Sequence, residues 1–171
     1  MRLRAIWGIA AAAFMAMAVW ATPAMGAGND VVLNAAAAQK LLPSQVYYHG
    51  RVATTQLRNA CGVKFSDGGY LLAVLVDTSG YSSEVAAKYQ AYLITEVPIR
   101  LGRQSLPAGV YGVGFIAGNE FVVTDVRAHG LLTAPYAVDE AMKRPIPLQI
   151  ISDPMGGFRL YEGRKYVRFK R

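Results

Sequence analysis

The chain has 171 residues, with 18 lysines and arginines against 11 aspartates and glutamates, and a single cysteine. This length fits one domain, and a domain of this size buries enough surface to fold without disulfides. One cysteine excludes an intrachain disulfide, and two histidines without HExxH spacing give no support to a metal site.

Residues 1–26 have the pattern of a signal peptide. Arg2 and Arg4 precede an apolar run of about a dozen residues, and Ala24 and Gly26 place small side chains at positions −3 and −1 of a cleavage site. The run is too short to span a membrane, and no cysteine follows it to carry a lipid. We therefore expect a mature domain, residues 27–171, that is periplasmic or secreted.

The positive charge of this mature chain is concentrated at its C-terminus. Residues 27–157 contain ten basic and ten acidic side chains, whereas residues 158–171 contain six basic side chains and one acidic one. Nucleic acid is not the expected partner of an exported protein with such a local excess. Membrane contact is expected only through this basic C-terminal strand.

The first predicted elements are a short helix and a hairpin. Residues 34–42 predict the helix, because Asn34 is a capping residue, alanines follow it, and Pro43 ends the run. Residues 63–76 predict a hairpin around a glycine-rich turn. Its second strand, residues 70–76, is continuously apolar, so we expect both of its faces to be covered.

Short strands dominate the rest of the chain. Further extended segments and hairpins are predicted at residues 89–101, 110–126, 147–151 and 158–169. Residues 135–143 predict a short helix, and residues 85–88 fit either a helical turn or the start of a strand. Eight or nine short strands at this spacing predict one all-β domain, a sandwich or small barrel with an N-terminal helix. Its expected core includes Leu72, Val74, Val76, Leu93, Val113, Phe115 and Val122.

In the last predicted strand, apolar and basic side chains alternate. Val167 and Phe169 are expected to face the core, with Arg168 and Lys170 on the opposite face. The preferred interpretation is an edge strand, where positive charge prevents edge-to-edge aggregation. The alternative is a patch that attracts anionic lipid or an acidic polymer.

A hydrolase is one functional alternative. The apolar strand that delivers Asp77, Thr78 and Ser79 into a tight turn is similar to the active-site strand of aspartic proteases. That chemistry requires two carboxylates that share a proton, here one from each subunit of a dimer. The family has glycine at the position of Ser79, and in this chain the glycine comes one residue later. The competing interpretation is an Asx turn in which Asp77 caps its own backbone.

Two other nucleophile patterns are incomplete. Gly80 and Ser82 have the spacing of the first glycine and the serine in a nucleophile elbow, but the closing glycine is missing, because Glu84 stands at its position. Cys61 with His49 would form a thiol dyad, although a lone cysteine is more often a small buried residue. Neither pattern supports catalysis.

A glycine-rich strand supplies the predicted binding site. Within residues 111–115, Gly112 and Gly114 alternate with bulky side chains, so one face of the strand is nearly bare backbone. Either an aromatic side chain such as Tyr89 or Tyr92 covers this face, or a ligand lies in the groove. The ligand-binding residues of the second interpretation are Tyr92, Tyr111, Gly112 and Gly114.

The segment that leads into this strand carries a resemblance. Its Leu-Pro-Ala-Gly-x-Tyr run, residues 106–111, is similar to a segment of exported bacterial β-sandwich proteins of unknown function. In this run Pro107 fixes a turn, and Gly109 is expected to allow a positive φ at the start of the strand. The resemblance implies an exported β-rich fold and supplies no catalytic residues.

Together these patterns favour an exported, non-catalytic module without a cofactor or metal, which binds a small apolar ligand or a cell-envelope partner. Two alternatives stay open, a hydrolase that uses Asp77 and a small outer-membrane β-barrel. The continuously apolar run of residues 70–76 counts against the membrane barrel, whose strands alternate between lipid-facing and interior side chains.

Overall fold

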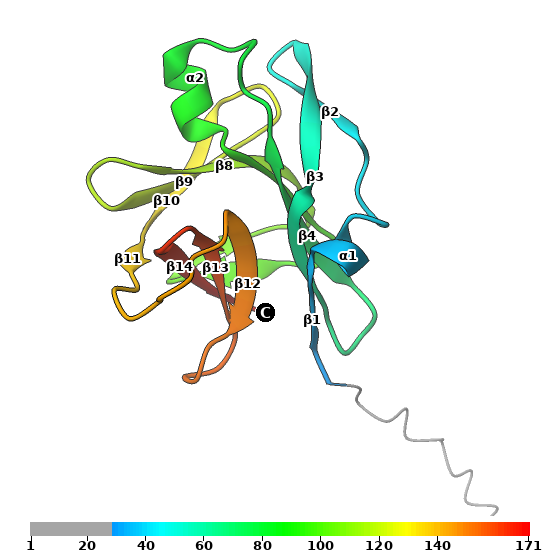
Figure 1. Cartoon of the computed structure of the whole chain (residues 1–171), viewed down its shortest axis with the longest axis vertical. Coiled ribbons are helices and arrows are strands. Elements are labelled where there is room, and N and C mark those ends of the chain that lie inside the picture. The colour runs from blue at the N-terminus through cyan, green and yellow to red at the C-terminus, as the bar shows by residue number, and fades with distance from the viewer. Residues whose placement is uncertain (1–28) are drawn as a thin grey trace, which may run out of the picture.

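The structure, a computed structural model, describes residues 29–171 and contains two antiparallel β-sheets that pack face to face (Figure 1). Of the two architectures that the sequence left open, it has the sandwich. The predicted signal peptide, residues 1–26, lies outside the described residues. Neither helix in the described part of the chain has the length and apolar character needed to cross a bilayer.

Eight strands form the first sheet. They are β1 Val31–Leu33, β2 Gln45–Tyr48, β3 Arg51–Lys64, β4 Tyr70–Val76, β5 Ala91–Thr95, β8 Gly109–Ile116, β9 Glu120–Thr124 and β10 Gly130–Pro135. Their order is β1-β3-β4-β5-β8-β9-β10, and β2 pairs with the first half of β3. A register shift between Thr55 and Ala60 interrupts the pairing of β3 with β4, and the first half of β3 forms a hairpin with β2.

Six strands form the second sheet. They are β6 Ile99–Leu101, β7 Gln104–Leu106, β11 Ala137–Val138, β12 Leu148–Ser152, β13 Phe158–Glu162 and β14 Lys165–Lys170. Their order is β12-β13-β14-β6-β7, and β11 pairs with the first residues of β14. The chain crosses from the first sheet to the second between β5 and β6, where Pro98 lies.

Two short helices lie against the first sheet, α1 Ala35–Ala38 and α2 Ser83–Lys88. The predicted cap of α1 is confirmed, because the Asn34 side chain accepts a hydrogen bond from the Ala37 amide at 3.0 Å. The Ser82 side chain caps α2 in the same way. Residues 85–88 are therefore helical.

The prediction of a helix at residues 135–143 is wrong. Ala137 and Val138 form β11 and pair with β14, and a turn at Asp139 follows. Pairing with an existing strand satisfies the backbone of this segment, whereas a short isolated helix is only marginally stable. Short pairings of this kind raise the strand count to fourteen, above the predicted eight or nine.

One core lies between the two sheets. The first sheet contributes Leu93, Val113 and Phe115 to it, and the second contributes Val167 and Phe169, all at most 4% exposed. The prediction that Val167 and Phe169 face the core is confirmed.

A second core covers the opposite face of the first sheet. Leu72, Val74 and Val76 pack there with residues of α1, β2 and the segment after α2. The expectation that both faces of β4 are covered is therefore confirmed. All seven predicted core residues are buried, but six of them divide three and three between the two cores instead of sharing one centre.

The position of β14 corrects the sequence-based interpretation of the C-terminal strand. One side of β14 pairs with β13, and the other side pairs with β11 and β6. An interior strand presents no free hydrogen-bonding edge, so its basic side chains do not protect an edge. Their charge requires another explanation.

Because β14 is an interior strand, replacement of its core side chains should destabilise the whole domain. We expect Phe169→Ala to lower the free energy of unfolding by about 3–5 kcal/mol, measured in urea, since the ring packs on Phe158 in the sandwich core. The neighbouring exposed variant Lys170→Ala should change it by less than about 0.5 kcal/mol. Equal effects of both variants would mean that β14 does not support the core.

Candidate functional site

The structure brings three of the four predicted ligand-binding residues together. Tyr92 and Gly112 are directly opposite each other on β5 and β8, and Gly114 lies two residues further along β8 on the same face. Tyr111 lies on the other face, in the core between the sheets. The four residues therefore do not line one groove.

The protein itself fills the space above the two glycines. A Cβ atom on Gly112 would lie 2.5 Å from Cε2 of Tyr48, and one on Gly114 would lie 2.7 Å from the carbonyl oxygen of Ala87 in α2. The ring of Tyr48 stacks on Tyr89 with centroids 3.6 Å apart. Tyr48 and α2 thus cover the bare backbone of β8, and not Tyr89 or Tyr92 as the sequence suggests.

Tyr111 stabilises the turn that precedes its own strand. Its hydroxyl donates to the carbonyl oxygen of Pro107 at 2.9 Å, and a Cβ atom on Gly109 would lie 2.7 Å from that hydroxyl. Gly109 does not have the positive φ that the sequence predicted. This position is glycine because the tyrosine lies so close to its backbone.

Asp77 lies exposed at the end of β4 and caps its own turn. Its Oδ1 accepts a hydrogen bond from the Ser79 amide at 3.0 Å, and this bond lowers the pKa of the carboxyl group. The Asx-turn interpretation is confirmed. The hydrolase alternative needs a second carboxylate that shares a proton with Asp77, whereas the hydrogen bond found here joins Asp77 to its own turn.

The other nucleophile candidates lie apart. Cys61 is buried between the sheets, and burial raises the pKa of its thiol. His49 is exposed in the turn between β2 and β3, with Nδ1 3.1 Å from the carbonyl oxygen of Arg127. Ser82 serves as the cap of α2. The structure therefore does not assemble a thiol dyad or a nucleophile elbow from these residues.

A concentration of positive charge lies on the outer face of the second sheet. Arg159 on β13 is directly opposite Arg168 on β14, and Lys170 on β14 is directly opposite Arg100 on β6. We call these four side chains the basic face. Like charges directly opposite each other on paired strands are unfavourable, so two successive pairs of this kind need compensation or a function.

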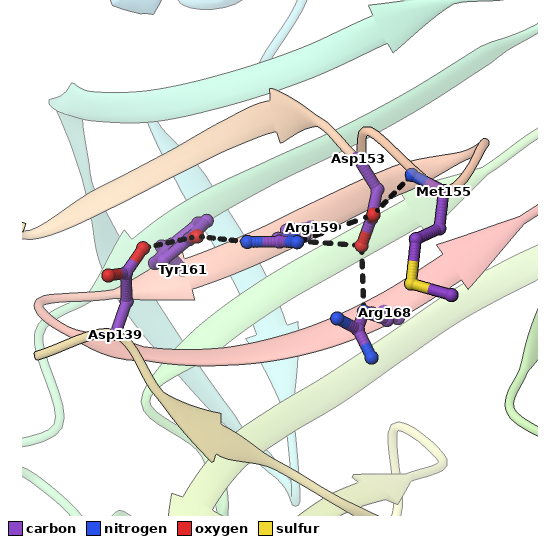
Figure 2. A network of polar contacts seen from close by, with 6 residues as sticks. All are labelled: Asp139, Asp153, Met155, Arg159, Tyr161 and Arg168. Carbon is purple, nitrogen blue, oxygen red and sulfur yellow. Dashed lines mark hydrogen bonds and ion pairs between the residues drawn. The ribbon is translucent and has the colours of Figure 1, made fainter. Parts of the chain in front are cut away.

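Asp153, which follows β12, compensates the first pair (Figure 2). Its Oδ2 accepts hydrogen bonds from Nε of Arg159 and from Nε of Arg168, both at 2.7 Å. Its Oδ1 accepts from the Met155 amide at 2.9 Å. The carboxylate is only 1% exposed, so it is a buried anion that holds two arginines in place.

Aromatic side chains complete this arrangement. The Tyr166 ring lies beneath both guanidinium groups, with its centroid 4.8 Å from Cζ of Arg159 and 5.7 Å from Cζ of Arg168. The Tyr161 hydroxyl lies 3.4 Å from Nη1 of Arg159 and donates to Asp139 at 3.0 Å. Hydrogen bonds from Arg159, Met155 and Arg168 together hold the pKa of Asp153 well below its usual value.

A hollow of about 230 Å³ opens beside this network. Its charged lining comes from Arg100, Arg168, Lys170 and Asp153, and Met155 borders it with a side chain exposed to solvent. A separate cleft of about 360 Å³ lies between β1 and β12, lined mainly by apolar residues that include Leu33 and Ile146. None of the four predicted ligand-binding residues lines either one.

Within residues 29–171, no group of three or more His, Cys, Asp or Glu side chains is arranged to hold a metal ion. Comparison of the chain with protein-family models, with curated proteins and with solved structures finds no match. The resemblance of residues 106–111 to exported β-sandwich proteins therefore stays a prediction.

The sequence predicts part of the basic face but not the role of Asp153, which holds two of its arginines in place. The alternation of residues 164–170 revealed that Arg168 and Lys170 share a face, but not that Arg100 pairs beside them from 70 residues away in the chain. The Asp-Pro-Met-Gly-Gly run that begins at Asp153 has turn-forming composition. That signal indicates a turn but not the two arginines that reach it.

The network predicts that Asp153 contributes strongly to stability. Asp153→Asn leaves two arginines opposite each other without their anion, so we expect the free energy of unfolding at pH 7 to fall by about 3 kcal/mol. This value is at the low end for a buried pair because the Arg168 side chain is 54% exposed. Urea unfolding measures the loss, and Asp77→Asn is the control, with an exposed carboxyl group in an Asx turn.

The same experiment has a pH dependence of known sign. The pKa of Asp153 is lower in the folded than in the unfolded chain, so its contribution is complete above the unfolded value, about 3.9. It is lost as the pH falls further. The difference between the wild type and Asp153→Asn should therefore shrink below about pH 4. A difference that is constant from pH 7 to pH 3 would contradict the network.

Proposed function

We propose that the protein is an exported, non-catalytic module that binds an acidic partner in the cell envelope through the basic face. This proposal rests on two cross-strand pairs of like charge, which we call rungs: Arg159 opposite Arg168, and Arg100 opposite Lys170. Both rungs include a residue of the interior strand β14. Like charges directly opposite each other on paired strands destabilise the fold, and on an interior strand they do not protect a sheet edge. A surface that retains them and orders them with a buried carboxylate suits recognition of negative charge.

The filled interior supports a partner in preference to a ligand inside the sandwich. The cavity between the sheets beside Val113 and Leu160 measures about 10 Å³, the space of a single water molecule at most. Small-molecule sites usually measure about 300–1,000 Å³. On the opposite face of that sheet, Tyr48 and α2 fill the space above Gly112 and Gly114.

Cell envelopes isolated from the organism that makes the protein provide the test. The purified protein should sediment with them at low salt, and Arg100→Glu with Lys170→Glu should weaken this binding at least tenfold, since each cation near an anionic surface contributes about 1 kcal/mol. The difference should vanish in about 0.5 M salt, where charges are screened.

The matched control reverses two exposed lysines that do not belong to the basic face, Lys40→Glu with Lys143→Glu. This control changes the net charge equally but should retain most of the binding. If both double variants lose binding to the same extent, the interaction depends on net charge alone and the basic face is not the site.

A small apolar ligand is the second candidate, and the cleft between β1 and β12 is the feature that favours it. Its volume of about 360 Å³ falls within the usual range for ligand sites. An apolar fluorescent probe should then bind the protein saturably, and Leu33→Trp, which places a larger side chain at the cleft, should abolish the signal. Probe binding that is unchanged in Leu33→Trp would exclude the cleft.

A further inference from the structure

The two like-charge rungs of the basic face differ in one respect. Asp153 lies between Arg159 and Arg168 and bonds to both. Among residues 29–171, neither Arg100 nor Lys170 forms an ion pair or a side-chain hydrogen bond, although the two lie directly opposite each other. The second rung thus has two cations and lacks the anion that the first rung contains.

A hollow lies beside the two cations of the second rung. It measures about 230 Å³ and is bordered by Arg100 and Lys170 of the second rung, by Arg168, and by the turn that carries Asp153. Arg168 uses only its Nε atom to bond Asp153, and within residues 29–171 its two Nη groups form no hydrogen bond. Three cationic side chains therefore border one hollow.

We propose that this hollow binds a phosphate group, with Arg100, Arg168 and Lys170 as its ligands. Two guanidinium groups can each donate two hydrogen bonds to a tetrahedral oxyanion, and the ammonium group adds a third positive charge. A phosphate monoester carries more than one negative charge near pH 7, which matches the two cations of the second rung better than a single carboxylate does. The inference rests on the proposed function and specifies the chemistry of the acidic partner.

The phosphate can belong to a lipid headgroup or to a free phosphorylated molecule, and two measurements distinguish these sources. The first is the melting temperature in inorganic phosphate against sodium chloride of equal ionic strength at pH 7. We expect a saturable rise of about 3–5 °C at ten times the dissociation constant. The second is sedimentation with vesicles that contain phosphatidic acid, against vesicles of phosphatidylcholine alone.

The test variant is Arg100→Gln with Lys170→Gln, and the matched control is Lys40→Gln with Lys143→Gln. In chloride the test variant should melt no lower than the wild type, because it removes an unfavourable like-charge pair. It should lose the rise in phosphate and bind the acidic vesicles at least tenfold more weakly. The control should behave like the wild type in both measurements.

Each outcome decides the inference. A phosphate-specific rise that depends on Arg100 and Lys170 assigns a free phosphate group, and vesicle binding with the same dependence but no rise assigns a lipid headgroup. If neither measurement separates the test variant from the control, the inference is wrong. The phosphate inference can fail while binding to cell envelopes still depends on the basic face, and the proposed function then stands. If envelope binding does not depend on the basic face either, the inference and the proposed function are both wrong.

Discussion

Because both faces of the first sheet are buried, its central strands carry apolar side chains at nearly every position and offer no open face to a partner. The second sheet covers one face, and α1, the β2–β3 hairpin and α2 cover the other. The outer face of the second sheet is thus the one broad sheet surface in residues 29–171 that can be polar. The positions of the charged side chains follow from this asymmetry.

On that outer face, a single buried carboxylate determines the arrangement of the cations. Asp153 fixes Arg159 and Arg168, and the aromatic ring of Tyr166 supports both guanidinium groups from below. Side chains held in this way lose less conformational entropy when a partner binds than free surface arginines do. The energetic cost of the ordered network is therefore met during folding and not during binding.

Local patterns in the sequence predicted the elements whose partners are close in the chain. The hairpin of residues 63–76 and the apolar side of β14 were predicted correctly, because alternation and turn residues report on neighbours a few positions away. The sequence did not predict β3 at its full length, since its polar residues and register shift break the period-2 pattern. It also missed the interior position of β14, which depends on pairing with β6 across some 70 residues. The site shares this limit in part, because Arg159 and Arg168 face each other within one hairpin, whereas Arg100 and Lys170 lie on strands distant in the chain.

Cys61 illustrates what burial in the sandwich means for the reactivity of a thiol. Its thiol lies between the sheets at 2% exposure, and burial raises its pKa, so the reactive thiolate is scarce in the folded protein. Cys61 also borders the cleft between β1 and β12, so oxidants and partner thiols reach this sulfur when that part of the sandwich opens. The rate at which Cys61 reacts consequently reports how often this part opens, and a destabilised copy would expose a thiol able to crosslink it to its neighbours.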